Sequence, residues 1–555
     1  MGPARGPRLF LWGNELSKPA SGLIAKVRKL KATGQIAEAA AMLGDLSDKD
    51  YPKEPELALE LGDCFMSLER FEDASRVYAR LAEAFPKSAL VYANLGAALY
   101  RCRRMQDAKS VLEHALDLDP KSMAARTNLG GVLQSMNDFS AALKNALELV
   151  SNHPTEALAF NNLGSAFSDL NNIEAARHAF ETAIMLKPGQ IDALTNLAVM
   201  ESRFGNFARA IELFQQAIDV LPDSALERKK SLEFYKAFDH LRLGELPVAW
   251  DLYESGFSKL VPINAMRSPD RQFGDKPRWK GEDLSGKTLL VWREQGIGDE
   301  LRFAACLEDL QGKVGRLIFE CSPRLSGVFS KAWPWVETRP ETPYSGSGVA
   351  QDFDFHLPVG SLMRFFRRDV ADFSRSRAFV NPEPRLVAKF LARLAERRQG
   401  KKLVGICWRS GLLTPTRNSE YTQVLDWAPL LARDDVVFVN LQYGESAQEL
   451  EEVRRELGVE ILNWPDLNLK NDVDDVFALI SCLDLVVTVR TTVNNMAGAV
   501  GTPCVLLIKD SHWSLLGQET YPWFPKNYTL LVPEAEQVAS HLPRVHAYLD
   551  ALGPE

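Results

Sequence analysis

The sequence predicts an α-helical solenoid followed by an α/β module with two doubly wound lobes, and three observations lead to this fold class. First, five prolines recur at a spacing of 34 residues: Pro86, Pro120, Pro154, Pro188 and Pro222. Second, this period disappears after about residue 259. Third, short apolar segments alternate with amphipathic ones from about residue 287 onward, which is the pattern of strands and helices in a parallel sheet.

The composition is that of an ordinary globular protein. The 555 residues are enough for about three or four domains, and 46% of them are hydrophobic and 25% charged. The net charge of −8 comes without a basic cluster, so we expect no nucleic-acid partner. No apolar run approaches the ~18 residues of a membrane span. The seven scattered cysteines form no C-x-x-C pair, and the apolar segment near the start is too short for an export signal. We therefore expect a cytoplasmic protein with reduced thiols.

Two further residue sets keep the 34-residue phase. One is Leu61-Gly62, Leu95-Gly96, Leu129-Gly130, Leu163-Gly164 and Leu197-Ala198, and the other is Ala74, Ala108, Ala142, Ala176 and Ala210. Small residues let two helices approach closely, and we expect large ones such as Tyr78, Phe180 and Phe214 to fill the gap between repeats. The period and the residue types resemble the tetratricopeptide repeat, a helix-turn-helix unit. We predict a tail over 1–22 and a solenoid over 23–258, with degenerate units at about 23–50 and 241–254.

One asparagine stands before the Leu-Gly or Leu-Ala pair of each of four repeats, as Asn94, Asn128, Asn162 and Asn196. An amide is both donor and acceptor, so such a ladder can bind the backbone of an extended acceptor peptide. The layout resembles the eukaryotic protein O-GlcNAc transferases, which hold acceptor polypeptides along a ladder of this kind. The alternative is that these residues only form hydrogen bonds between helices.

The second half is predicted as two α/β lobes. After a linker over 259–286, strands are expected at 288–292, 317–321 and 353–357, with a helix over about 299–310, in an N-terminal lobe over 287–382. A long helix within 383–402 leads to a C-terminal lobe over 403–555, with strands at 403–408, 436–439, 485–489 and 503–507. All-apolar strands are typical of parallel sheets, whose ligands bind at the carboxyl ends of the strands. This layout implies a two-lobed glycosyltransferase of the GT-B type.

The segment Gly296-Ile297-Gly298-Asp299-Glu300 joins the first strand of this module to a helix. Its glycines permit a tight turn, and an aspartate at a helix start is commonly a cap. The segment resembles the G-x-G-D loop of ADP-heptose heptosyltransferases and their repeat-fused bacterial relatives. The resemblance implies that Asp299, with Glu300 second, is the general base for the acceptor hydroxyl, and that Gly296 and Gly298 lie beside the donor.

The segment from Thr488 to Pro503 reads as a strand, a polar turn and a helix of small residues. It resembles the D-T-x-x-x-H-x-A-x-A-x-G segment of the same family, in which a helix N-terminus receives the donor diphosphate. The resemblance assigns donor contacts to Arg490, Thr491, Thr492, Asn494 and Asn495. Arg490 stands where the family usually has Asp and Asn495 where it has His. The extra arginine favours a more anionic donor, and the same departures are compatible with an inactive domain.

Other polar turns complete the predicted donor site. Trp408-Arg409-Ser410-Gly411, with Arg417 in the loop that follows, resembles the second phosphate-contacting turn of the family, and a solvated salt bridge is the alternative for either arginine. Gln442 lies at the end of the next strand, where it is predicted to contact a nucleobase. Lys470-Asn471-Asp472 precedes a helix, as a sugar contact or as a cap.

We predict no metal and no cofactor, the nucleotide sugar being a substrate. Two D-x-D strings, Asp352-Phe353-Asp354 and Asp472-Val473-Asp474, suit a strand start and a helix cap better than a metal site. No H-x-x-x-H spacing, G-x-S-x-G elbow or Walker A pattern is present, which argues against hydrolase, protease and ATPase functions.

The same order of modules occurs in bacterial glycosyltransferases that modify flagellins. The resemblance therefore implies transfer of a sugar to Ser or Thr hydroxyls of a protein acceptor, such as flagellin, recruited by the repeats. Two alternatives remain: a transferase acting on a glycan or lipid, and a repeat scaffold whose transferase-like half is inactive. The sequence leaves the sugar, the nucleotide, the stereochemical outcome and the oligomeric state open.

Overall fold

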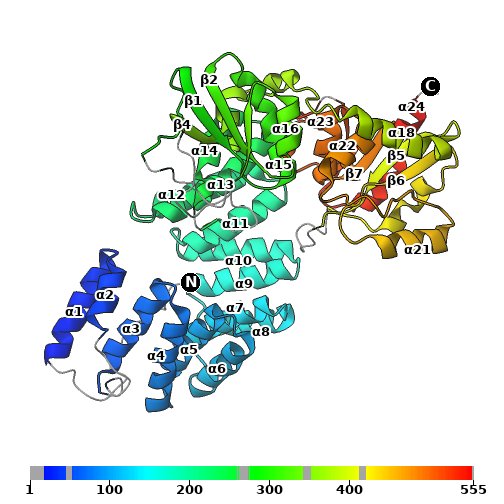
Figure 1. The fold of residues 1–555 in the computed structure, drawn as a ribbon. Coiled ribbons are helices and arrows are strands. Elements are labelled where there is room, and N and C mark those ends of the chain that lie inside the picture. The colour runs from blue at the N-terminus through cyan, green and yellow to red at the C-terminus, as the bar shows by residue number, and fades with distance from the viewer. Residues whose placement is uncertain are drawn as a thin grey trace. The chain divides into compact units, whose positions relative to one another are not determined.

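The structure, a computed structural model, describes residues 18–552 apart from 45–49, 51–52, 259, 262–272, 274, 342–351, 412–419 and 525. It divides into two compact units, Met1–Met200 and Glu201–Glu555. The first consists of helices, and the second contains the last repeat helices together with two parallel sheets (Figure 1). Within the described residues no helix is both long enough and apolar enough to cross a membrane.

The first unit is a succession of helix pairs with the predicted 34-residue period. The first helices of the pairs are α1 (Lys18–Ala32), α3 (Pro55–Ser67), α5 (Ala89–Arg101), α7 (Met123–Ser135), α9 (Ala157–Asp169) and α11 (Ile191–Arg203), the last of which runs into the second unit. The second helices are α2 (Ile36–Met42), α4 (Phe71–Ala84), α6 (Met105–Leu118), α8 (Phe139–Asn152) and α10 (Ile173–Leu186). The predicted degenerate leading unit is the pair α1 and α2, and α1 begins within the predicted tail.

The repeat phase has a direct packing reason. A Cβ atom added at Gly62 would lie 2.5 Å from the ring of Tyr78, and one added at Gly164 would lie 2.6 Å from the ring of Phe180. The rings of Tyr78 and Phe180 therefore fill the space between the two helices of one repeat, and not the space between repeats that the sequence predicts. The turn after each first helix uses a left-handed residue at the same phase, with φ between 56° and 63° at Glu69, Arg103, Asn137 and Asn171.

The second unit begins with the closing helices of the solenoid. These are α12 (Phe207–Val220), α13 (Leu226–Arg242) and α14 (Leu246–Tyr253), followed by the 3-10 turn η1 (Glu254–Phe257). The indole N–H of Trp250 donates to the Arg367 carbonyl at 2.8 Å, and Arg242 Nε donates to the Ser511 carbonyl at 2.9 Å. The closing helices thus contact both lobes, which explains why they share a compact unit with the α/β module.

The N-terminal lobe is a four-stranded parallel sheet of order β3-β2-β1-β4. Its elements are β1 (Leu284–Trp292), α15 (Ile297–Ala304), η2 (Ala305–Leu310), β2 (Val314–Cys321), α16 (Ser326–Ala332), β3 (Glu337–Pro340), β4 (Phe355–Pro358), η3 (Val359–Leu362), α17 (Met363–Phe366) and η4 (Val370–Arg375). The three predicted strands are present, and the predicted helix over 299–310 is α15 continued by η2. The edge strand β3 was not predicted, because its sequence Glu-Thr-Arg-Pro is polar and only partly buried.

The C-terminal lobe is a five-stranded parallel sheet of order β6-β5-β7-β8-β9. Its elements are α18 (Pro384–Arg398), β5 (Lys402–Cys407), η5 (Val424–Trp427), α20 (Ala428–Leu431), β6 (Val436–Asn440), α21 (Ala447–Leu457), α22 (Val473–Ser481), β7 (Leu485–Val489), α23 (Thr492–Val500), β8 (Cys504–Lys509), η6 (Trp513–Leu515), β9 (Asn527–Val532), η7 (Val538–Arg544) and α24 (Val545–Ala551). Every residue of β7 and β8 is buried, as expected of a doubly wound sheet. The edge strand β9 was not predicted.

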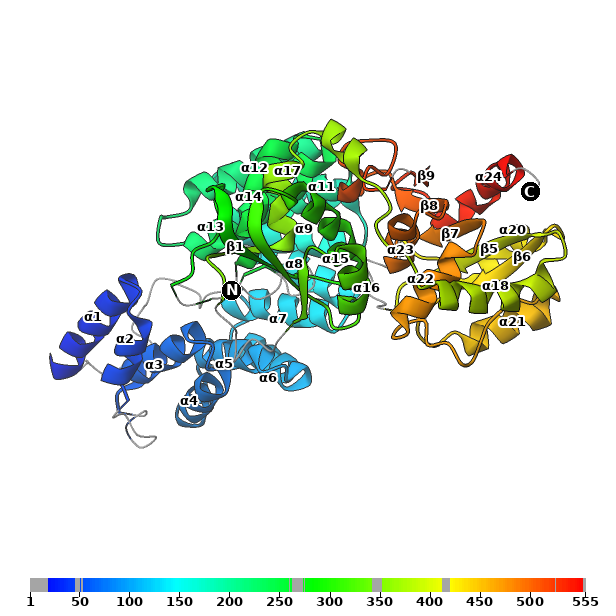
Figure 2. The ribbon, with the colours of Figure 1, turned by 45° about the horizontal axis from the view of Figure 1, so that its top comes forward.

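The two lobes lie side by side, with α15 and α23 on the sides that face each other (Figures 1 and 2). Both helices follow the carboxyl end of a strand, β1 and β7 respectively. The segments that carry the two main sequence motifs therefore meet at the boundary between the lobes.

Candidate functional site

The site is built where the first turns of α15 and α23 touch. A Cβ atom added at Gly298 would lie 3.1 Å from Asn495 Nδ2 and 3.3 Å from Thr492 Oγ1. Gly296 is the N-cap residue of α15, and its carbonyl accepts from the Glu300 N–H at 2.9 Å. The glycine at position 298 thus lets a helix start from one lobe approach a helix start from the other.

Asp299 lies in the first turn of α15, with 30% of its side chain exposed. Its Oδ1 accepts a hydrogen bond from Arg302, one turn further along the helix. Its Oδ2 has no hydrogen-bond partner among the residues that the structure describes. Asp299 is therefore held through one carboxylate oxygen, and its side chain is partly exposed to solvent.

Arg302 is held by aromatic rings of the C-terminal lobe. Its guanidinium carbon lies 4.7 Å from the ring centroid of Trp513 and 5.0 Å from that of Trp523, distances at which a cation is attracted to an aromatic face. Only 7% of the Arg302 side chain is exposed, and its buried Nε has no partner in the described part of the chain. This residue connects the carboxylate of Asp299 to the other lobe.

Glu300 does not reach the junction. It is fully buried, with Oε1 accepting from the Ser322 N–H at 2.7 Å and Oε2 paired with Arg293 Nε at 3.1 Å. Burial raises the pKa of Glu300 to about 7, against the opposing effects of Arg293 and the Ser322 N–H. Because both oxygens are engaged inside the N-terminal lobe, the geometry gives Glu300 a structural role in place of the predicted secondary catalytic one.

The N-terminus of α23 is suited to an anion. Thr491 is the N-cap residue, and its Oγ1 accepts from the Val493 N–H at 3.2 Å. The first turn of α23 contains no acidic residue, so no carboxylate of the helix itself neutralises the positive end of the helix dipole. Thr492, the first residue of α23, is half-buried at the contact with Gly298.

Arginine side chains add positive charge beside this helix end. Arg490 Nε donates to Glu420 Oε2 at 2.6 Å. Burial disfavours the charged guanidinium of Arg490, but Glu420, Tyr421 and Asp299 together hold its pKa above the usual value. The pKa of His512 lies well below its usual value, first because the imidazole is buried and then because of the charges of Arg490, Arg242 and Arg302. This imidazole is therefore neutral at pH 7.

Asn494 and Asn495 lie inside the junction. Asn494 is 1% exposed, and its Nδ2 donates to Asn495 Oδ1 at 3.1 Å, whereas its Oδ1 has no partner among the described residues. Asn495 Oδ1 also accepts from the hydroxyl of Tyr521 at 2.9 Å. Asn495 therefore positions the turn, and Asn494 carries a buried acceptor atom that is not satisfied by the protein.

The predicted second phosphate turn has mainly structural contacts. Arg409 is paired with both carboxylate oxygens of Glu449 on α21. This contact agrees with the salt bridge that the sequence leaves open as the alternative to a phosphate contact. Gln442 is fully buried, and its Oε1 accepts from the backbone N–H groups of Trp408 and Arg409 at 3.2 and 3.0 Å. The Gln442 side chain thus shapes this turn and is not available to a nucleobase. Ser410 is buried and accepts from the Tyr443 hydroxyl at 3.1 Å.

Two further predicted contacts involve Arg417 and the segment 470–472. Arg417 lies outside the described residues. Asp472 is the N-cap residue of α22, and its Oδ2 accepts from the Asn468 N–H at 2.8 Å. Asp472 thus occupies the predicted cap position, although its side chain makes no capping hydrogen bond to α22.

The asparagine ladder is used between repeats. All four residues are half-buried. The donated bonds are Asn128 Nδ2 to the Ala93 carbonyl at 3.2 Å, Asn162 Nδ2 to Thr127 Oγ1 at 3.3 Å, and Asn196 Nδ2 to Asn161 Oδ1 at 3.0 Å. Neighbouring repeats thus take up the amide donors of these three residues. The Oδ1 atoms of Asn128 and Asn196 have no partner among the described residues.

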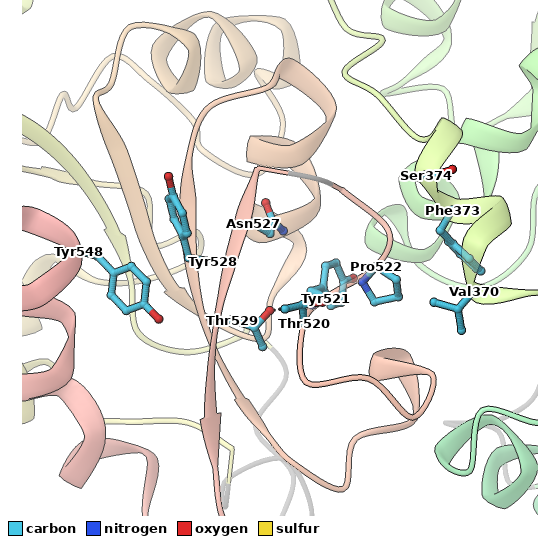
Figure 3. A pocket seen from close by; sticks show the side chains of 10 residues that line it. All are labelled: Val370, Phe373, Ser374, Thr520, Tyr521, Pro522, Asn527, Tyr528, Thr529 and Tyr548. Atoms are coloured by element: carbon cyan, nitrogen blue, oxygen red, sulfur yellow. Dashed lines mark hydrogen bonds between the residues drawn. The ribbon is translucent and has the colours of Figure 1, made fainter. Parts of the chain in front are cut away.

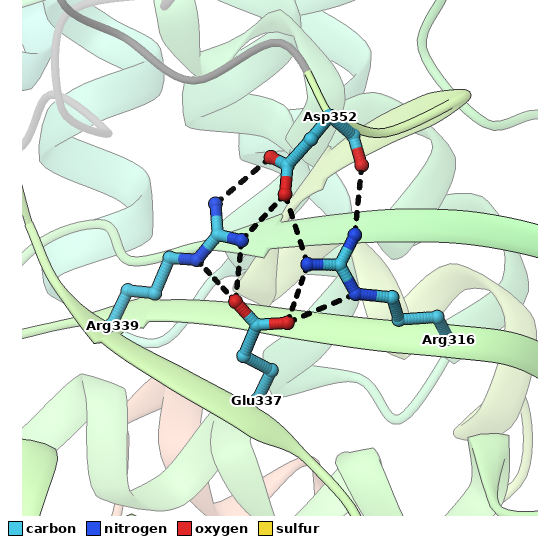
Figure 4. Close-up of polar contacts among 4 residues, drawn as sticks. All are labelled: Arg316, Glu337, Arg339 and Asp352. Carbon is cyan, nitrogen blue, oxygen red and sulfur yellow. Dashed lines mark hydrogen bonds and ion pairs between the residues drawn. The ribbon is translucent and has the colours of Figure 1, made fainter.

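The carboxylates of the first D-x-D string already have partners. Asp352 is paired with Arg339 and Arg316, which also contact Glu337, in a network on the edge of the N-terminal lobe (Figure 4). Asp354 Oδ2 accepts from the Thr288 N–H at 2.7 Å. In the second string, Asp474 is paired with Lys331 at 3.1 Å. These contacts account for both strings as structural features.

Several residues of the junction carry no sequence signal. Arg302 sits in an ordinary amphipathic helix, and His512, Trp513 and Tyr521 come from the irregular segment between β8 and β9. No motif or period marks that segment, and only the tertiary fold brings it to the start of α23.

Comparison with protein families identifies the repeats. Models described as tetratricopeptide repeat match residues 30–99, 89–122 and 161–225. The helical part of the chain is therefore a tetratricopeptide-repeat solenoid, a type of scaffold for protein partners.

Among curated proteins, the chain is similar to protein FlbA of Caulobacter vibrioides. The two are 36% identical over 307 residues, which is 53% of this chain and 50% of FlbA. The chain thus spans about half the length of the curated relative that it matches.

Three similar solved structures each cover about a third of the chain. MamA from Desulfovibrio magneticus is 24% identical and covers 30% of this chain and 93% of its own, with a TM-score of 0.26. PilF of Pseudomonas aeruginosa is 19% identical and covers 36% and 88%, with a TM-score of 0.30. YrrB, a tetratricopeptide-repeat protein with an unusual peptide-binding site, is 22% identical and covers 32% and 92%, with a TM-score of 0.24.

Proposed function

We propose that the chain is a GT-B glycosyltransferase that moves a sugar from a nucleotide-activated donor to a Ser or Thr hydroxyl of a protein acceptor. The observation that supports this most directly is the contact at Gly298, which brings Asp299 of one lobe to the N-terminus of α23 in the other. A carboxylate that accepts a proton and a helix end that receives a phosphate are the two groups this reaction needs.

The proposed chemistry uses Asp299 as general base. Its Oδ2 accepts the proton of the acceptor hydroxyl while the hydroxyl oxygen attacks the anomeric carbon of the sugar. The bond between that carbon and the phosphate oxygen breaks, and its electron pair leaves with the nucleotide. Arg302 holds Oδ1, so it fixes which carboxylate oxygen faces the acceptor.

The leaving nucleotide is stabilised by fixed positive charge. The N–H groups of the first turn of α23 and the guanidinium of Arg490 face the departing phosphate, where they act as electrostatic stabilisers. The added arginine at this position favours a donor with more negative charge, such as one whose sugar carries a carboxylate. This scheme assigns no step to a metal.

The acceptor is proposed to be a bacterial protein, such as flagellin, bound along the repeats. The solenoid supplies an elongated scaffold, and Oδ1 of Asn128 and of Asn196 are acceptors for backbone N–H groups of an extended chain. The similarity to a bacterial protein and the repeat architecture support this part of the proposal.

Donor binding is tested with a matched pair of substitutions at the start of α23. Thr492→Glu places a carboxylate where the phosphate is proposed to bind, whereas Thr492→Gln has almost the same shape without the charge. We expect a panel of nucleotide sugars and nucleoside phosphates to raise the Tm of the wild-type chain and of T492Q, because a ligand that binds only the folded state stabilises it. The same ligands should leave the Tm of T492E unchanged. An equal ligand effect on both variants would place the phosphate elsewhere.

Acceptor binding is tested on the full chain as well. Asn128→Ala with Asn196→Ala should weaken retention of the protein acceptor, whereas Glu113→Ala with Glu181→Ala, on exposed positions of the second helices, should not. Circular dichroism melting checks that both double variants fold. Transfer to a free glycan or lipid but to no protein would favour the alternative acceptor. Absence of both donor binding and transfer would favour the inactive scaffold.

A further inference from the structure

A pocket of about 530 Å³ lies at the start of the edge strand β9, next to the junction described above, with which it shares Tyr521. It is lined by three segments of the C-terminal lobe and by the η4 segment of the N-terminal lobe (Figure 3). Its size is within the range of about 300–1,000 Å³ that is usual for small-molecule sites. Apart from Tyr521, whose hydroxyl donates to Asn495 Oδ1, none of the lining residues takes part in the proposed transfer.

The lining is aromatic and polar but carries no charge. Tyr521, Tyr528, Tyr548 and Phe373 supply rings, and two threonines and a serine supply hydroxyl groups, while no lysine, arginine, aspartate or glutamate is among the lining residues. Tyr528 and Tyr548 lie with their ring centroids 5.4 Å apart. Such a lining suits a neutral molecule that has an apolar face and many hydroxyl groups.

Asn527 is the most unusual residue of this pocket. It is 7% exposed, yet neither Oδ1 nor Nδ2 has a hydrogen-bond partner among the described residues. Buried side-chain amides are almost always hydrogen-bonded, so an amide with both atoms unsatisfied needs an explanation. In Figure 3 its side chain lies between Tyr528 and the pair Tyr521 and Pro522. A rotation of this side chain toward the pocket presents a donor and an acceptor together.

From these observations we infer that the pocket binds a neutral saccharide. The amide of Asn527 pairs with two adjacent hydroxyl groups of the sugar, one as donor and one as acceptor. An aromatic face takes the apolar C–H face of the sugar ring. A nucleotide does not fit this lining, because no cation is present to balance its phosphates.

The inference is independent of the proposed transfer and is tested by direct binding. The full-length chain is titrated with neutral monosaccharides and disaccharides, and binding is followed by calorimetry and by the fluorescence of Trp523, whose ring lies 4.9 Å from that of Phe373 in the pocket wall. We expect at least one saccharide to bind with a Kd in the millimolar range or below. The variants Asn527→Leu and Tyr548→Ala should each weaken it at least tenfold.

Each other outcome overturns the inference. Failure of every saccharide to bind would mean that Asn527 is satisfied by water alone. Binding that both variants retain would place the saccharide elsewhere. Displacement of the saccharide by a nucleoside phosphate would make the pocket part of the donor site. Asn527→Leu is expected to fold, because it replaces an unsatisfied buried amide by an apolar group of similar size, and Tyr548→Ala changes a half-buried residue at the rim.

Discussion

The contact between the closing repeat helices and the C-terminal lobe yields a prediction that can be worked out in numbers. Gly517, which follows η6, has φ of +73°, and a Cβ atom added there would lie 2.8 Å from the backbone N and 3.1 Å from the Cα of Gly244. Gly244 belongs to the turn between α13 and α14. The substitution Gly517→Ala therefore introduces both an unfavourable backbone conformation and a steric clash with another backbone.

The two effects can be separated with a matched control. Gly458, which ends α21, has φ of +67°, but a Cβ atom added there meets no atom within 4 Å. Gly458→Ala should cost only the conformational penalty, about 1 kcal/mol. In Gly517→Ala a backbone has to move, so we add the usual cost of overpacking and expect a total of about 2–4 kcal/mol.

Urea unfolding followed by tryptophan fluorescence measures this difference. Trp250, Trp513 and Trp523 lie at or near the contact, so their emission reports on it. We expect Gly517→Ala to lower the unfolding midpoint clearly more than Gly458→Ala does, with a change in emission of the folded state. Equal midpoints for the two variants would show that the closing helices do not pack against the C-terminal lobe at Gly517.

Two more predictions concern buried and exposed charges. The folded-state pKa of Glu300 is about 7 and the unfolded value is about 4.3, so the folded state binds the proton more tightly. The free energy of unfolding should therefore fall by roughly 3 kcal/mol as pH rises from about 4.5 to 7. In Glu300→Gln the free energy of unfolding should change less with pH over this window, and an unchanged slope would contradict the raised pKa. The Asp352 network has partly exposed members, so Asp352→Asn should cost no more than about 1 kcal/mol at low salt and less at 0.5 M salt. A larger loss that salt does not reduce would contradict the expected screening of these charges by solvent.

The sequence was sufficient to predict the elements that repeat or that are apolar throughout. The 34-residue phase of the Leu-Gly pairs reflects a packing constraint. In four repeats the glycine of the first helix lies against a side chain of the second helix, which is Tyr78, Leu112, Asn145 or Phe180. Strands β5, β7 and β8 are buried on both faces, so their apolar runs are visible. The edge strands β3 and β9 face solvent on one side, and their mixed sequences gave no such signal.

The site could be predicted only where a motif accompanies it. The glycine turn before Asp299 and the helix start at Thr491 are local patterns, and the fold brings them together. A local pattern does not report burial, so it placed Glu300 beside Asp299 although the helix turns its side chain into the lobe. Arg302 and His512 were missed for the complementary reason, because their environment is made by segments distant in the chain.

The proposed sugar transfer depends most directly on Asp299. The decisive measurement is the rate at which the purified chain increases the mass of a protein acceptor in the presence of a nucleotide sugar. The wild-type chain is compared with Asp299→Asn and with Asp283→Asn, a substitution of the exposed aspartate immediately before β1. We predict a loss of at least about a hundredfold for D299N, with donor binding retained and with D283N active. Transfer by D299N at the wild-type rate would contradict the proposed mechanism.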